Sequence, residues 1–231
     1  MTPKKREIAE REARILAVAR PMVVQNGYHG INMDRIAEEV GYSKGTIYNH
    51  FSCKEEVIIA LAVESSSKRV EFFRKAAEFK GCARHRMHAI GYAAERFVRD
   101  YPEFFQFEKI LELQSVREKT SEKRQAVVQG CEMQCMSVVA GIVRDAVSAG
   151  DLKLQKAMSP EELVFGLWSL TSGAFSIILS SDSLTQMGMK DPWQTVRTHI
   201  LAVLDGFNWQ PLSSEYDAEK LRSKIRREVL A

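Results

Sequence analysis

The chain has 231 residues, of which 45% are apolar and 27% are charged. These proportions are ordinary for a globular protein and exclude a disordered or collagen-like chain. The length allows one or two domains with a substantial hydrophobic core. The formal net charge is +3, and residues 1–54 hold the whole excess, with nine basic and six acidic side chains. A polyanionic partner would therefore bind in the first quarter of the chain.

The chain carries no pattern typical of secretion or of a membrane. Four cysteines are too sparse for a small secreted domain, and the charged N-terminus lacks the apolar segment of a signal peptide. The most apolar stretch, residues 163–179, contains four hydroxyl side chains, and a membrane span needs about 20 mostly apolar residues. We therefore expect a soluble, cytoplasmic protein with no membrane partner.

Apolar residues recur with a period of 3.6, and no stretch alternates as a β-strand would. The sequence therefore predicts an all-α protein. Pro21 is expected to kink the first helix, and proline after a capping Ser159 or Asp191 marks two later helix starts. In chain order, the expected helices span residues 5–26, 33–40, 44–51, 53–79, 83–100, 102–116, 120–149, 160–181, 192–207 and 214–230.

Residues 32–54 carry the most informative pattern, two short helices joined by a three-residue turn. Gly41 suits the left-handed position that ends a helix, and Ser43 can cap the helix that follows. The second helix places polar side chains on its outer face and Ile47 and Phe51 on its inner face. A short helix held in this way can enter the major groove of DNA, so the pattern predicts a helix-turn-helix.

This segment resembles the N-terminal module of TetR-type bacterial transcription regulators. The resemblance rests on the run GYSKGTIYNHF at residues 41–51 with Lys54-Glu55 after it, and on Ile15-Leu16, Gly27-Tyr28 and Ile36-Ala37. It covers about residues 8–57. The resemblance implies a three-helix DNA-binding domain over 1–54 and a helical ligand-binding and dimerisation domain over 55–209. The helix 53–79 would connect the two domains, and an amphipathic helix would follow over 210–231.

The resemblance also implies that the partner is double-stranded DNA with a near-palindromic operator. A lysine donates to guanine O6 and N7, and an asparagine pairs with adenine. Arg35, in the preceding helix, would add a contact. The residues expected to touch phosphates are Thr46, Tyr48, His50 and Lys54. The residues expected to face base edges are Ser43, Lys44, Gly45 and Asn49.

A pocket for a small apolar effector is implied within each subunit, between residues 83 and 180. Such pockets are mostly apolar, although aromatic stripes are more often plain core. The sequence does not identify the effector. The candidate lining residues are Phe104, Phe107, Cys131, Cys135, Phe165, Trp168 and Phe175.

A homodimer is expected because the helix 160–181 is apolar nearly all round, which a monomer would not easily cover. Two subunits would also present two recognition helices to a two-fold site. The candidate interface residues lie in this helix and in the next: Leu163, Leu167, Leu170, Val196, Ile200, Val203, Leu204 and Phe207.

The sequence-based hypothesis is a dimeric repressor that a small ligand releases from its operator, and three alternatives remain. The first is an architectural DNA-binding protein without a working pocket. The second is a redox-responsive regulator that uses Cys131 and Cys135. The third is a helical enzyme or partner-binding protein whose module no longer touches DNA. We expect no catalytic site and no cofactor, because no catalytic motif or phosphate-binding loop is present. We expect no metal, because Cys82, His85 and His88 lack a fourth ligand.

Overall fold

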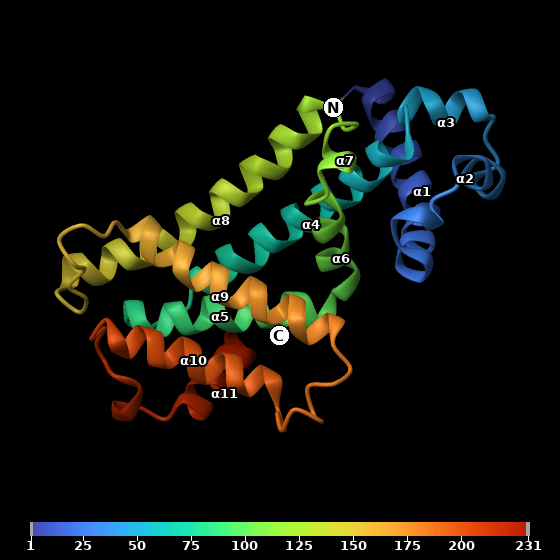
Figure 1. Ribbon diagram of the computed structural model, residues 1–231. Helices are drawn as coiled ribbons and strands as arrows, with labels where there is room; N and C mark the ends of the chain where they lie inside the picture. Colours follow the sequence, from blue (N-terminus) through green and yellow to red (C-terminus); the bar gives the residue numbers. More distant parts are fainter. Residues whose placement is uncertain (1, 230–231) are drawn as a thin grey trace. The chain divides into compact units, whose positions relative to one another are not determined.

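Figure 1 shows the computed structural model, which describes residues 2–229. All its regular elements within that range are helical, which confirms the predicted all-α class. The α-helices are α1 (Pro3–Asn26), α2 (Met33–Val40), α3 (Lys44–His50), α4 (Lys54–Ala77), α5 (Ala83–Asp100), α6 (Pro102–Leu111), α7 (Gln114–Arg117), α8 (Glu122–Ala149), α9 (Pro160–Ser180), α10 (Pro192–Gly206) and α11 (Ala218–Glu228). Two short 3₁₀ helices, η1 (Gly27–Gly30) and η2 (Ser213–Glu215), complete the set.

α1 covers the expected first helix and continues through Pro21, which lies exposed inside it. One element departs from the expected helices. The helix expected over 102–116 is divided into α6 and α7. Leu113 between them has an extended backbone (φ −69°, ψ 118°), which interrupts the helical hydrogen-bond ladder.

The described chain folds as two compact units that differ from the expected domains. The first unit comprises the residues up to Lys68 together with Tyr101–Cys131, and the second comprises Arg69–Asp100 together with the residues from Glu132 onward. No boundary falls at residue 54, because the start of α4 buries apolar side chains in the same core as the first three helices. α6 and α7 add to that core. Its most deeply buried members include Ile15, Ile36, Ile47, Phe51, Val57, Leu61, Phe107 and Val116.

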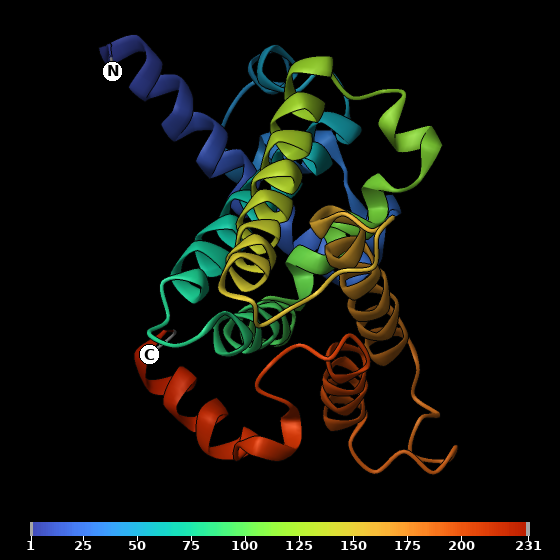
Figure 2. The same ribbon diagram turned by 90° about the vertical axis from the view of Figure 1, so that its left-hand side faces the viewer.

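The second unit packs α5, α9, α10, α11 and the later part of α8 around one core. Trp209 and Leu204 lie at its centre, 0% and 1% exposed. The sequence left the role of residues 210–231 open. In the structure, α11 lies against α5 and buries Leu221 and Ile225, four residues apart on one face (Figures 1 and 2). The C-terminal helix therefore covers α5 within this unit.

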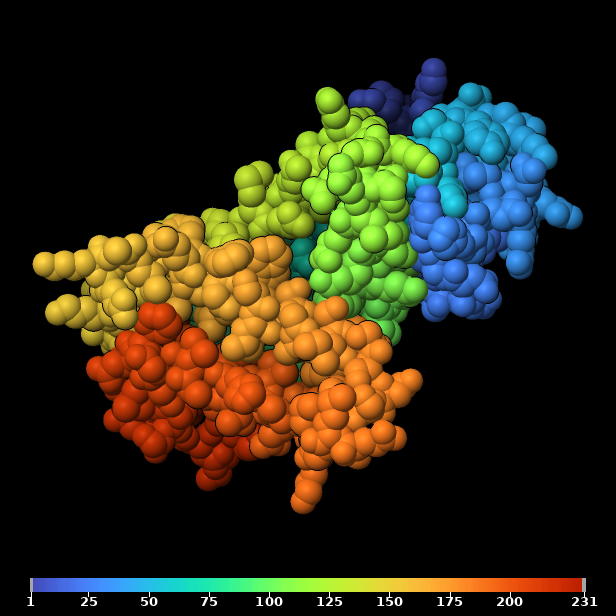
Figure 3. Space-filling view, in the orientation of Figure 1, coloured from blue at the N-terminus to red at the C-terminus, as the bar shows by residue number. Residues whose placement is uncertain are grey.

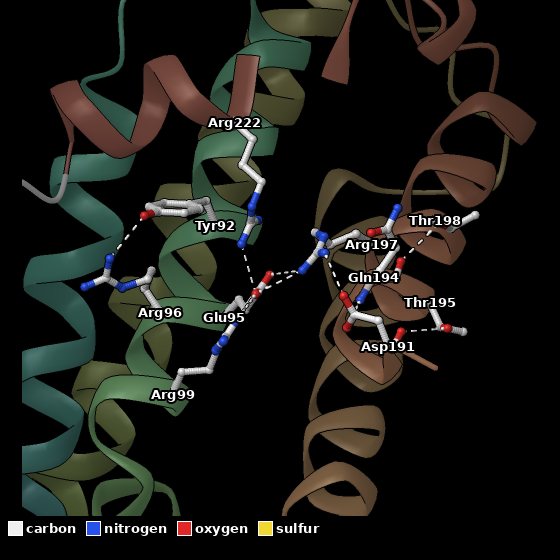
Figure 4. A network of polar contacts seen from close by, with 10 residues as sticks. All are labelled: Tyr92, Glu95, Arg96, Arg99, Asp191, Gln194, Thr195, Arg197, Thr198 and Arg222. Atoms are coloured by element: carbon white, nitrogen blue, oxygen red, sulfur yellow. Dashed lines mark hydrogen bonds and ion pairs between the residues drawn. The ribbon is translucent and has the colours of Figure 1, made fainter. Parts of the chain in front are cut away.

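A buried carboxylate joins three helices of the second unit (Figure 4). The Glu95 side chain on α5 is 4% exposed and accepts hydrogen bonds from Arg197 of α10 at 3.0 and 3.1 Å. Arg222 of α11 donates at 2.9 Å and Arg99 of α5 at 3.0 Å. One anion therefore holds three guanidinium groups, and it ties α10 and α11 to α5.

Candidate DNA-binding interface

Local capping interactions define the two helices of the predicted helix-turn-helix. The Asn32 side chain accepts hydrogen bonds from the backbone N–H groups of Asp34 and Arg35 at the start of α2. Gly41 ends α2 in the left-handed conformation (φ 72°, ψ 31°), where a side chain would cost free energy. Ser43 Oγ then accepts from Thr46 N–H and starts α3. The turn predicted from Gly41 to Ser43 is confirmed.

α3 is anchored by its apolar face and leaves its other face open. Ile47 and Phe51 are both 0% exposed, and α3 lies at the surface of the first unit (Figure 3). Tyr48 is 47% exposed. Thr46, His50 and Lys54 are half-buried, while the remaining candidates for base contacts are exposed: Ser43, Lys44, Gly45 and Asn49.

Gly45 has open space beside it. A Cβ atom built there would meet Ser43 Oγ at 3.8 Å as its nearest neighbour, which is ordinary van der Waals contact. The folding of this chain therefore does not require glycine at this position. A requirement for glycine would have to come from a partner that approaches the backbone closely.

The basic side chains of the module have intramolecular partners that the sequence analysis missed. Lys44 Nζ lies 2.6 Å from Asp34 Oδ2, and this hydrogen bond and its charge raise the pKa of the Lys44 ammonium above its ordinary value. Arg35 pairs with Glu39 one turn later. Lys54 Nζ lies 4.0 Å from the centre of the Tyr28 ring. Spacing along α2 could have revealed the Arg35 pair, whereas the Lys44 pair depends on the turn between α2 and α3.

The first turns of α8 are clamped onto the same module. Arg124 donates to Glu56 of α4 at 3.0 Å and to Glu12 of α1 at 2.7 Å, and its guanidinium lies 4.8 Å from the centre of the Phe51 ring. The backbone N–H of Ser121 also donates to the Glu56 carboxylate. We call these contacts the Arg124 clamp. α8 is thereby attached to the three-helix module.

A second contact fixes the start of α4. The Tyr28 hydroxyl donates to Glu55 Oε1 at 2.5 Å, and this hydrogen bond, together with burial, raises the pKa of Tyr28 to about 12. Lys119 Nζ lies 3.4 Å from the same carboxylate oxygen. The buried Glu55 therefore joins η1, α4 and the turn before α8.

Comparison with known proteins supports this arrangement. The family model for bacterial regulatory proteins of the tetR family matches residues 15–61, which include α2, α3 and the turn between them. The comparisons support a TetR-family transcriptional regulator. The relatives are HTH-type transcriptional regulators, and regulators of this kind are not enzymes.

Three comparisons with individual proteins show how far the similarity extends. The HTH-type transcriptional repressor AcnR of Corynebacterium diphtheriae is 40% identical over 65 residues, which cover 28% of this chain and 34% of AcnR. The HTH-type transcriptional regulator UidR of Escherichia coli is 27% identical over 172 residues, 73% of this chain and 82% of UidR. The structure of FadR from Bacillus subtilis in complex with stearoyl-CoA has a TM-score of 0.61 at 15% identity and covers 84% of this chain and 98% of FadR. The last match shows a shared fold.

The predicted effector-lining residues are divided between the two compact units. Phe107 lies in the core of the first unit with Phe104 beside it, their ring centroids 6.2 Å apart. Phe165 and Trp168 lie on the open face of α9, 58% and 52% exposed, so they line no enclosed cavity. Phe175 is buried in the second unit. Cys131 and Cys135 are free, and each is 8% exposed.

Four of the eight predicted dimer residues are buried inside the subunit, and the other four are only partly buried and stay a prediction. Leu163, Leu167, Val196 and Leu204 belong to the buried core of the second unit, and Ile200, Val203 and Phe207 are partly buried against it. Leu170 is half-buried. The large apolar residues that α9 does expose are Phe165, Trp168, Ile177 and Leu179. Because α9 is apolar on every side, the sequence pattern could not distinguish its inner face from its outer face.

Of the three residues with metal-like composition, His85 and His88 both contact Tyr216, and Cys82 is a free cysteine. His88 hydrogen-bonds the Tyr216 hydroxyl, and the His85 and Tyr216 rings pack edge to face. Among residues 2–229, no group of three or more His, Cys, Asp and Glu side chains is arranged to hold a metal ion. Burial, followed by the nearby Arg84 charge, lowers the pKa of His88 to about 4.

Proposed function

We propose that this regulator is a cytoplasmic, dimeric, sequence-specific DNA-binding protein that a small apolar ligand releases from a near-palindromic operator. The proposed DNA binding rests on how α3 is packed in the first unit. Its apolar side chains hold it against the first-unit core, while Lys44, Gly45 and Asn49 face solvent together. A helix held in this way can approach base edges in the major groove.

Gly45 provides a test that separates DNA contact from folding. Replacing Gly45 by Ala fills open space and should raise the free energy of unfolding by up to about 1 kcal/mol, because alanine favours a helix. If the Gly45 backbone approaches DNA closely, the same variant binds the operator more weakly. A matched control is Gly130→Ala in α8, which also has open space around it and lies outside the helix-turn-helix.

The two variants are compared by urea unfolding and by titration of an operator selected from random duplexes at about 150 mM salt, because affinity depends on salt. The proposal expects Gly45→Ala to lose operator affinity while Gly130→Ala keeps it. Equal affinity of wild type and both variants would contradict close DNA approach at Gly45. Absence of any selected operator would favour the architectural alternative.

The dimer proposal is supported by apolar surface that the chain itself leaves uncovered. α8 and α9 are long and apolar enough to cross a membrane, but core helices of soluble proteins meet the same criterion. Only 33% of the most apolar window of α8 and 22% of that of α9 are buried inside the structure. α9 exposes the large apolar side chains of Phe165, Trp168, Ile177 and Leu179. Exposed patches of this kind mark interaction sites, and a second copy related by a two-fold axis would cover both helices at once.

The proposed response to a ligand is supported by a similar protein that binds a ligand and by two helices that extend through both compact units. The FadR structure is described in complex with stearoyl-CoA. In this chain, α4 and α8 each contribute residues to both compact units, and the Arg124 clamp attaches the start of α8 to the recognition module. We infer that a ligand acts by changing the relative stability of two positions of these helices, since it shifts an equilibrium only by its differential affinity.

A library of acyl and other apolar small molecules, screened by thermal shift and then by operator release, tests this part. The proposal expects a compound that raises the melting temperature and lowers operator affinity. A compound that binds the second unit tightly without changing operator affinity would contradict the coupling.

A further inference from the structure

An ion pair bridges the two helices of the helix-turn-helix. Lys44 Nζ and Asp34 Oδ2 are 2.6 Å apart, and the side chains are 66% and 56% exposed. Both partners sit at helix starts with defined caps, since Asn32 accepts from the Asp34 N–H group and Ser43 precedes Lys44 as the cap of α3. A donor and an acceptor are thus held side by side on the face proposed to meet DNA.

The contribution of this ion pair to the stability of the fold is too small to explain why the two side chains are paired. An exposed Lys–Asp pair contributes little to the free energy of folding, because both charges remain hydrated. The pair also borders an open hollow between α2 and α3, whose lining includes Asn32, Ala37 and Tyr42. The two charges are therefore reachable by an external partner with matching chemistry.

A G·C base pair presents the complementary pattern in the major groove. Guanine offers O6 and N7 as acceptors, and cytosine offers its N4 amino group as a donor. O6 and N4 are joined by a base-pairing hydrogen bond, so they lie about 2.9 Å apart. That separation is close to the 2.6 Å between Lys44 Nζ and Asp34 Oδ2. The ammonium can face O6 while the carboxylate faces N4.

We propose that Asp34 and Lys44 act as one unit that reads a G·C base pair in each half-site, with Lys44 donating to guanine and Asp34 accepting from cytosine N4. This inference rests on the proposed DNA-binding function and adds a specificity-determining residue to it. Asp34 also acts against wrong sites. Its carboxylate is repelled by phosphate and by the acceptor atoms of other base pairs. It also pairs with Lys44, whose ammonium would otherwise bind any phosphate.

The test compares wild type, Asp34→Asn and Lys44→Met as full-length proteins, each used to select duplexes from a random pool at about 150 mM salt. Wild type is expected to enrich a G·C pair at one fixed position of each half-site. Both variants should lose that preference by about tenfold or more while the other positions keep theirs. Asp34→Asn should also bind a non-specific duplex more tightly, with a steeper salt dependence, by about one phosphate contact per subunit.

Glu122→Gln is the matched control, because it removes the same charge from an exposed position of the first unit that does not line the hollow between α2 and α3. It should leave every base preference unchanged. Far-UV circular dichroism verifies that the variants fold.

The outcomes separate this inference from the proposed function. If wild type enriches no sequence, the proposed function fails and the inference fails with it. If wild type enriches an inverted repeat and Asp34→Asn enriches the same bases with equal strength, the inference alone is overturned. If Glu122→Gln relaxes the same position as strongly as Asp34→Asn, net charge rather than the Asp34–Lys44 unit is responsible, and the inference is again overturned.

Discussion

Replacing Glu95 by Gln should lower the free energy of unfolding of the second unit by more than the loss of any exposed ion pair would. Glutamine keeps the size of the side chain and removes its charge. Arg99, Arg197 and Arg222 then face one another without the anion that all three contact. The perturbation therefore tests whether this carboxylate holds α10 and α11 on α5.

The size of the effect follows from burial. Removing one partner of a buried ion pair costs about 3–5 kcal/mol, because the remaining charge is left uncompensated. Glu95 is 4% exposed, while Arg197 and Arg222 are each 24% exposed and Arg99 is 50% exposed. The arginines can turn partly toward water, so we expect the lower end, about 3 kcal/mol. For a unit of this size the melting temperature should fall by about 10 °C.

Tryptophan fluorescence is a suitable probe, because Trp168, Trp193 and Trp209 all lie in the second unit. Urea unfolding of Glu95→Gln is compared with Asp145→Asn, which removes an exposed pair with Arg86 in the same unit and should cost less than about 1 kcal/mol. Added salt should reduce the Glu95→Gln penalty by screening the three arginines. If the two variants lose equal stability, Glu95 is solvated in the folded state and our reasoning from its burial is refuted.

Three further predictions concern DNA, assembly and pH. Tyr48→Ala should change the free energy of unfolding by less than about 0.5 kcal/mol, since the side chain is 47% exposed. The same variant should bind the operator about tenfold more weakly, and an unchanged affinity would show that Tyr48 does not contact DNA. The double variant Phe165→Ser with Trp168→Ser should raise the dimer dissociation constant about 100-fold or more by sedimentation, and an unaltered constant would exclude this face of α9. The pKa of His88 is about 4 when folded and ordinarily 6.5, so the folded state disfavours protonation and wild type should lose up to about 3 kcal/mol between pH 6.5 and pH 4. His88→Gln, which can still hydrogen-bond Tyr216, should lack that part of the pH dependence, and parallel stability curves for the two proteins would contradict it.

Features that depend on residues close together in the chain were predictable from the sequence. Ser159 and Glu162 form the capping box that precedes α9, and Asp191 caps α10. Gly41 takes the left-handed conformation that its place after α2 suggested. Caps and turns are made by groups within about four residues, so residue type and spacing are enough to specify them. The run at residues 41–51 likewise identified the helix-turn-helix.

Contacts between helices were not predictable in the same way. Helical periodicity indicates which residues of one helix share a face, but not which neighbour covers that face. In α9, where every face is apolar, Leu163 and Leu167 were therefore assigned to a dimer and Phe165 to a cavity, whereas the structure buries the two leucines and exposes the phenylalanine.

Charged side chains show the same division between sequence and tertiary structure. The sequence placed the basic excess in residues 1–54 and identified the outer face of α3, because charge count and helix period are properties of the chain alone. Only the tertiary structure decided that Lys44 meets Asp34, that Arg124 joins the start of α8 to Glu12, and that Glu95 of α5 meets Arg197 of α10 and Arg222 of α11. Each of these pairs joins different helices, and the crossing of helices is set by how their apolar faces pack, which no local spacing records.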